Sequence, residues 1–150
     1  MVKKITVAGI GPGSYESMTL EVLSTLKECD VIVGYNLYIE LLKPYFSNKE
    51  FLQNGMMSEE ERCKLAVRMA EEGKKVVLVC SGDAGIYGLA GLVTEYAQKS
   101  SELEVQVLPG ITAALSGAAL LGAPLINDFA VVSLNDVVSG FSIDFGGKDI

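Results

Sequence analysis

A glycine-rich turn at residues 81–88, directly after an apolar run at residues 75–80, is the feature that most restricts how this chain can fold. The run is short and rich in β-branched residues, which is typical of a parallel strand covered on both faces. In an open α/β sheet, ligands bind where such a strand passes into the next helix. Gly82 and Gly85 have no Cβ, so the backbone there can approach a ligand closely.

Asp83, the acid of this turn, allows two interpretations. Its carboxylate can accept hydrogen bonds from a ligand, or it can cap the helix that follows. A lone Gly-Asp pair favours capping. Two further turns in the chain change that balance toward a binding site.

The first of these turns, residues 9–13, follows a predicted strand at residues 4–8. It resembles a dinucleotide-binding loop only in part, because the third glycine of that pattern would fall at Ser14 and no acid ends the second strand, residues 30–33. Pro12 also removes a backbone N–H that a phosphate group would need. The turn is therefore suited to a flat or extended ligand held against backbone, and poorly suited to a phosphate.

The second turn, residues 108–114, follows a predicted strand at residues 103–107. It opens a helix that is apolar nearly all round, as expected for a helix buried under another layer. In a parallel sheet the turns that follow the strands lie at the same edge. We therefore expect the turns at Gly9, Gly82 and Gly110 to converge on one concavity.

Strands and helices alternate along the chain, which predicts the α/β class, with an open parallel sheet flanked by helices and right-handed crossovers. The remaining predicted elements are a helix that begins near Ser17 or Thr19 and ends before Asp30, a strand at 30–33, a short helix at 38–42, a short strand at 50–52, helices at 58–72 and 86–97, and a last strand at 129–132.

Two of these helices are predicted from apolar stripes. In the helix at 58–72, Ser58 and Glu61 form a capping box. Its apolar stripe is Cys63, Ala66, Val67 and Ala70, and that of the helix at 86–97 is Ile86, Ala90, Val93 and Ala97.

The composition excludes several classes of protein. No apolar run reaches the roughly 18 residues of a membrane span, and the start of the chain does not resemble a signal peptide. The three cysteines are scattered and histidine is absent, so we expect neither a metal site nor a disulfide framework, and we expect a reducing cytoplasm. The net charge of −7 argues against a nucleic-acid partner.

Three motifs in this order resemble the tetrapyrrole methylases, which use S-adenosylmethionine: Gly-Ile-Gly-Pro-Gly at 9–13, Ser-Gly-Asp-Ala-Gly-Ile-Tyr-Gly at 81–88 and Pro-Gly-Ile-Thr-Ala-Ala at 109–114. Within the family, the closer resemblance is to members that methylate C-17 of a corrin precursor, precorrin-3B or cobalt-precorrin-3, with ring contraction in cobalamin biosynthesis. This closer resemblance is carried by residues 33–39, 54–56, 90–93, 121–125, 128–129 and 132–136.

The resemblance covers residues 1–136 and implies the N-terminal α/β domain of that fold, with a second domain apparently missing. Residues 137–150 have no family resemblance and form a divergent tail. In the family the cofactor lies in the cleft between two domains. We therefore expect this chain to bind S-adenosylhomocysteine weakly if at all, because half of a cleft buries less of a ligand than a complete one.

The resemblance also implies the site residues. The cofactor-binding residues are Pro12, Ser81, Gly82, Asp83, Ile86, Thr112 and Ala113. The substrate-binding residues are Gly11, Pro12, Gly13 and Tyr87. No catalytic acid or base can be assigned and no metal is expected. S-adenosylmethionine already carries an activated methyl group, so the protein chiefly has to align the two reactants.

Some of these residues have structural alternatives. Pro12 also suits a rigid turn, and Thr112 also suits the N-cap of a helix. Tyr35, Tyr38 and Tyr87 are candidates for stacking on a flat macrocycle, although aromatic residues near strand ends more often belong to the core.

The expected partner is a tetrapyrrole, which carries several carboxylates. An acidic chain needs local Lys or Arg to bind such a substrate. A homodimer is expected because family members are dimers and because the apolar segments near residues 111–121 and 129–132 need a cover. The alternatives are a non-catalytic ligand-binding or dimerising domain, and a methylase acting at another ring position or on another substrate such as diphthamide.

Overall fold

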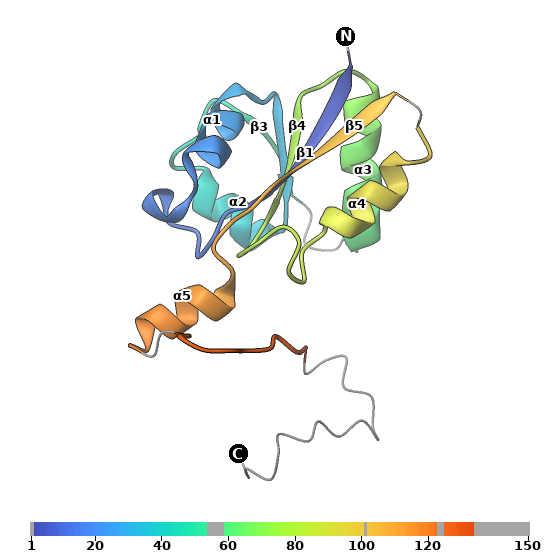
Figure 1. Ribbon diagram of the computed structural model, residues 1–150. Helices are drawn as coiled ribbons and strands as arrows, with labels where there is room; N and C mark the ends of the chain where they lie inside the picture. Colours follow the sequence, from blue (N-terminus) through green and yellow to red (C-terminus); the bar gives the residue numbers. More distant parts are fainter. Residues whose placement is uncertain (1, 54–58, 101, 123–124, 134–150) are drawn as a thin grey trace.

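The computed structural model describes residues 2–53, 59–100, 102–122 and 125–133, and in this part of the chain five parallel strands form one sheet (Figure 1). The strands are β1 (Lys3–Gly9), β2 (Val31–Gly34), β3 (Glu50–Gln53), β4 (Val76–Cys80) and β5 (Leu103–Leu108). Their order in the sheet is β3-β2-β4-β1-β5. The predicted α/β class with an open parallel sheet is confirmed.

Helices cover both faces of this sheet (Figure 1). On one face lie α1 (Leu20–Glu28) and α2 (Asn36–Leu42), preceded by a short 3₁₀ helix, η1 (Tyr15–Ser17). On the other face lie α3 (Glu59–Glu71) and α4 (Ala90–Ala97). The last helix, α5 (Ala113–Leu120), leads away from the sheet below its carboxyl edge. In the described residues, no helix has the length and apolar character needed to cross a lipid bilayer.

The central strand β4 shows why the sheet needs two covers. Val76 and Leu78 pack in the core on the side of α3 and α4, whereas Val77 and Val79 pack on the side of α1 and α2. Each of these side chains is at most 2% exposed. The continuous β-branched run predicted this double burial, because a strand with one wet face would alternate apolar and polar residues.

The stripe predicted for α3 is confirmed. Cys63, Ala66, Val67 and Ala70 are all buried, and they pack against the sheet. Ser58, the other half of the predicted capping box, lies outside the described residues. At the start of α1, the Thr19 hydroxyl accepts a hydrogen bond from the N–H of Val22 and caps the helix.

Three predictions about local structure are wrong. α4 begins at Ala90, so Ile86 belongs to the preceding turn and is 43% exposed. Residues 129–132 form no strand and are exposed, because no strand of the described sheet pairs with them. The helix predicted to be buried under another layer, α5, has no buried residue. Apolar spacing and apolar composition predicted these features, but burial and strand pairing depend on tertiary partners.

The turns after β1, β4 and β5 meet at one edge of the sheet, as predicted. Gly11 and Gly82 exchange two backbone hydrogen bonds, of 3.0 and 2.9 Å, and form an antiparallel bridge between otherwise parallel segments. A Cβ on Gly9 would lie 2.5 Å from the carbonyl oxygen of Gly82, and a Cβ on Gly110 would overlap the same oxygen. The three turns therefore pack backbone against backbone.

This packing predicts opposite effects for two glycine substitutions. Gly110→Ala should lower the free energy of unfolding by about 1–3 kcal/mol, because its Cβ would collide with backbone that cannot move aside. Gly91→Ala is the matched control, because Gly91 is helical and a Cβ there would contact nothing within 4 Å. It should raise the free energy of unfolding by about 0.5–1 kcal/mol. Urea unfolding measures both, and equal effects of the two substitutions would contradict the packing described.

Candidate functional site

Asp83 joins the turn after β4 to the turn after β5. Its Oδ1 accepts a hydrogen bond of 2.9 Å from the N–H of Gly110. Its Oδ2 accepts hydrogen bonds of 2.8 and 3.2 Å from the N–H groups of Gly85 and Ile86 within its own turn. One carboxylate thus holds two turns that are 27 residues apart in sequence.

The charge of Asp83 is stabilised by these contacts. Burial acts to raise the pKa of the carboxyl group, but hydrogen bonds from backbone N–H groups outweigh this effect and hold the pKa below its ordinary value. The donors are Gly110, Gly85, Ile86 and Ala84. The capping interpretation of Asp83 is wrong, since the residue at the N-cap of α4 is Leu89. The carboxylate instead fixes the shape of the turn.

Several of the residues expected at a cofactor site lie together at this edge. A Cβ on Gly82 would lie 3.4 Å from the backbone nitrogen of Ala113 and 3.5 Å from Cα of Thr112. The antiparallel bridge between Gly11 and Gly82 places the turn at residues 9–13 next to these residues. Around this contact Pro12, Ser81 and Ile86 are exposed. Thr112 occupies the N-cap position of α5, but its side chain makes no capping hydrogen bond.

A cavity of about 440 Å³ opens beside the turn after β4. Its lining residues are Tyr35, Tyr38, Glu59, Arg62, Val79, Cys80, Ser81, Tyr87, Gly88 and Leu89. They come from β4 and its turn, from the start of α2 and from the start of α3. Neither Gly9 nor Gly110 lines this cavity, so the expected concavity lies to one side of the three turns and not between them.

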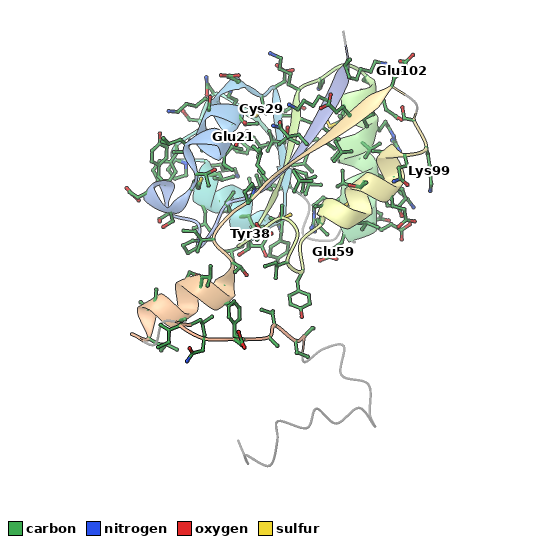
Figure 2. All side chains as sticks on the ribbon, viewed as in Figure 1. Glu21, Cys29, Tyr38, Glu59, Lys99 and Glu102 are labelled. Atoms are coloured by element: carbon green, nitrogen blue, oxygen red, sulfur yellow. The ribbon has the colours of Figure 1, made fainter. Side chains whose placement is uncertain are left out.

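Tyrosines form much of the cavity wall, and in Figure 2 Tyr38 and Glu59 lie at the carboxyl edge of the sheet. The rings of Tyr35 and Tyr38 meet edge to face, with centroids 5.5 Å apart. Tyr87 is 65% exposed and has a φ of 52°, in the left-handed region that residues other than glycine rarely adopt. Tyr35 and Tyr87 are exposed, so the core interpretation is wrong for them, whereas Tyr38 is partly buried and packs against the core on the side of α1 and α2.

Arg62 is the functional candidate that sequence reasoning missed. It is only 8% exposed, and its guanidinium carbon lies 5.8 Å from the centroid of the Tyr35 ring. The sequence predicts Arg62 neither in the apolar stripe of α3 nor at the site. A signal was present, because Arg62, Ala66 and Met69 are spaced i, i+4, i+7 and so share the buried side of the helix.

The cysteines are unsuited to nucleophilic chemistry. All three are free and buried. Burial raises the pKa of Cys63 to about 12 and that of Cys29 to about 11, and it also raises the pKa of Cys80. They are therefore thiols at neutral pH, while the nucleophilic form is the thiolate. Among the described residues, no group of three or more Cys, Asp or Glu side chains could hold a metal ion.

Comparison with known proteins gives consistent matches over nearly the whole chain. A family model described as "Tetrapyrrole (Corrin/Porphyrin) Methylases" matches residues 4–140. A probable cobalt-factor III C(17)-methyltransferase of Salmonella typhimurium is 44% identical over 140 residues, which cover 93% of this chain and 58% of that protein. A cobalt-factor III methyltransferase of Priestia megaterium is 43% identical over 91% of this chain and 26% of its own length.

Solved structures agree with these matches. The crystal structure of the methyltransferase CobJ superposes with a TM-score of 0.79 at 38% identity, covering 89% of this chain and 56% of that one. A uroporphyrin-III-C-methyltransferase from Thermus thermophilus superposes with a TM-score of 0.73 at 25% identity, covering 85% and 56%. This chain thus spans between about a quarter and three fifths of the length of these proteins.

The hydrogen bonds of Asp83 predict a pH-dependent loss of stability in Asp83→Asn. An asparagine cannot accept at both positions, so the free energy of unfolding at neutral pH should fall by about 1–3 kcal/mol. Because the folded pKa lies below the unfolded value of about 3.9, this difference should be constant above about pH 5 and should shrink as the pH falls through the folded pKa.

Glu104→Gln serves as the control, because Glu104 is exposed on β5. It should change the free energy of unfolding by less than about 0.5 kcal/mol. Denaturant unfolding between pH 3 and pH 7 gives the comparison. If the loss in Asp83→Asn were the same at pH 3 as at pH 7, the stabilising form would not be the ionised carboxylate.

Proposed function

Because the chain belongs to the family of tetrapyrrole methylases, we propose that it takes part in methyl transfer from S-adenosylmethionine to C-17 of a corrin precursor, with ring contraction, in cobalamin biosynthesis. The observation that carries this proposal is the meeting of the turns at residues 9–13, 81–86 and 110–113 at one sheet edge. The names of the most similar relatives support the reaction and the substrate. The whole reaction is proposed for a protein of which this chain resembles a part.

The cofactor surface proposed here is the meeting point of the three turns. Gly11 and Gly82 are buried beneath it and bond to each other, and Pro12, Ser81 and Ile86 surround it with exposed side chains. Because the two glycines carry no side chain, an extended ligand can approach these turns closely. Thr112 and Ala113 approach Gly82 from the third turn. Asp83 belongs to this surface as a positioning residue, since backbone N–H groups occupy both of its oxygens.

The chemistry proposed for these residues is alignment. When bound, the cofactor supplies an activated methyl group, so the protein has to hold the nucleophilic carbon in line with it and keep water out. Holding two reactants in this way can lower a barrier by about 7–11 kcal/mol. Turns locked to each other by hydrogen bonds suit this task, because their geometry is set before the ligand arrives. Gly11, Pro12, Gly13 and Tyr87 are proposed to contact the tetrapyrrole.

Two measurements on the chain test this proposal. In ¹⁵N-labelled protein, S-adenosylhomocysteine should shift amide resonances of residues 11, 13, 81–86 and 110–113, with weak affinity, because these residues form the proposed cofactor surface. Amides of Lys74 and Lys75, at the opposite edge of the sheet, should not shift. With ¹³C-methyl S-adenosylmethionine and cobalt-factor III, labelled methyl should appear in the corrinoid product.

The location of the shifts decides the outcome. Shifts at the three turns without methyl transfer would favour the alternative of a non-catalytic ligand-binding domain. Absence of both shifts and transfer would contradict the proposed function. Gly91→Ala should behave as wild type in both measurements, because Gly91 is exposed on α4 and a Cβ there would contact nothing within 4 Å.

A homodimer is the proposed assembly. α5, its C-cap Leu121 and residues 125–133 expose large apolar side chains, with Leu120 at 87%, Leu121 at 82% and Ile126 at 81%. Apolar patches of this kind usually become interfaces, and a symmetric pair is the commonest way to cover them. We also propose a reducing cytoplasm, because the three thiols are free, and no nucleic-acid partner, because of the net charge of −7.

Sedimentation velocity at tens of micromolar tests the assembly. Wild type should sediment as a dimer, and Leu120→Glu with Leu121→Glu should sediment as a monomer, because both charges would be buried in the proposed interface. Leu37→Glu is the control, because Leu37 is also exposed, at 60%, but lies on α2. A clean wild-type monomer would refute the dimer.

A further inference from the structure

The cavity beside β4 has one cation in its lining, and we propose that Arg62 binds a carboxylate side arm of the tetrapyrrole there. The inference rests on the proposed function and names how its substrate would be recognised. It makes Arg62 a specificity-determining residue for acidic side arms. Nothing in the sequence motifs pointed to this residue, because the family motifs lie in the turns.

Burial strengthens the attraction between the guanidinium of Arg62 and a carboxylate. A guanidinium keeps its charge at any physiological pH, and it presents several N–H donors in a fork that matches a carboxylate. At 8% exposure it is largely withdrawn from water. An ion pair is much stronger in such an environment than at the surface, where water screens it. One buried arginine can therefore contribute more to carboxylate binding than several surface lysines.

The ring of Tyr35 lies close to this guanidinium. The ring centroid lies 5.8 Å from the guanidinium carbon, within the range of a cation–π contact. Tyr38 supports the Tyr35 ring edge to face. Stacking engages the face of a guanidinium, whereas carboxylates bind along its edge. A stacked ring thus leaves the donor edge for a carboxylate, and the tyrosine pair supplies aromatic surface to a flat ligand beside the cation.

The overall charge of the chain makes a local cation necessary. With a net charge of −7, the protein as a whole repels a polycarboxylate. Lys3, Lys4, Lys74 and Lys75 line a different cavity, at the amino edge of the sheet. Lys64, on the same helix as Arg62, forms an ion pair with Glu60 at 2.6 Å. Among the ten residues that line the cavity beside β4, Arg62 is the only one that carries a positive charge.

The position of the cavity suits a side arm of a ligand whose ring lies at the turns. Ser81, Tyr87 and Gly88 line the cavity and belong to the same turn as Gly82 and Asp83. An arm anchored on Arg62 would therefore hold the macrocycle beside the proposed cofactor surface. The volume of about 440 Å³ is sufficient for an acetate or propionate arm together with part of a ring.

Glu59 also lines the cavity beside β4, and its negative charge is opposite to that of Arg62. Its side chain is exposed, one helical turn before Arg62. A carboxylate there repels an acidic arm and weakens its binding. Removal of this charge should act in the opposite direction to removal of Arg62, and an exposed residue can be exchanged with little effect on folding.

Equilibrium dialysis with two corrin probes tests the proposal on the chain. Dicyanocobyrinic acid carries carboxylate arms, and its heptamethyl ester carries neutral ones. Arg62→Met should lose about tenfold or more in affinity for the acid and should bind the ester as wild type does, because only the charged arm loses its partner. Arg62→Lys should keep part of the affinity, and Glu59→Gln should gain severalfold for the acid alone.

Arg68→Met is the matched control, because Arg68 lies on the same helix but is exposed. It should bind both probes as wild type does. Equal affinity of Arg62→Met and wild type for the acid, or no preference of wild type for the acid over the ester, would overturn the proposal. Should Arg62→Met lose its circular dichroism signal, an unchanged acid affinity in both Arg62→Lys and Glu59→Gln would overturn it.

Failure of this inference differs from failure of the proposed function. The amide shifts caused by S-adenosylhomocysteine at the three turns do not depend on Arg62, so Arg62→Met should retain them. Retained shifts with unchanged acid binding would remove only the role of Arg62. Absence of the shifts in wild type would remove the cofactor site itself.

Discussion

The contact of three backbone turns at the carboxyl edge of the sheet is the constraint on which the rest of this structure depends. Gly9 and Gly110 lie so close to the carbonyl of Gly82 that no side chain fits between them. The ionised Asp83 carboxylate adds charge-assisted hydrogen bonds to the same assembly. Sheet pairing brings the strands β1, β4 and β5 together, but these contacts convert three flexible turns into one rigid surface.

The elements that sequence could predict are those whose signal is local. The strand predicted at residues 75–80 and the buried stripe predicted for α3 could be recognised from residue spacing and from the residues at their ends. The structure has a strand and a helix at these places. Residues 129–132 have the composition of a strand, but a strand also requires a neighbour to pair with. Ile86 continued a helical period, although the hydrogen bonds of Asp83 shape its segment as a turn.

The residues of the candidate site also fall into those that local sequence predicts and those that only the fold reveals. The glycines and Asp83 were recognisable because their chemistry is specific to a turn after a strand. Arg62 was not recognised, because a charged residue on an amphipathic helix is usually solvated and only tertiary packing shows it to be buried. The tyrosines of the cavity were considered as candidates, but only the fold could place Tyr35 against the guanidinium.

The paired hydrogen bonds between Gly11 and Gly82 restrict how this chain can change in length. Loops generally accept insertions and deletions, because few contacts depend on their register. Here the two turns bond to each other in one register, so one residue added to either turn would move an N–H donor away from its carbonyl acceptor. It would also move Asp83 away from the N–H of Gly110. The turns after β1 and β4 are therefore expected to keep a constant number of residues.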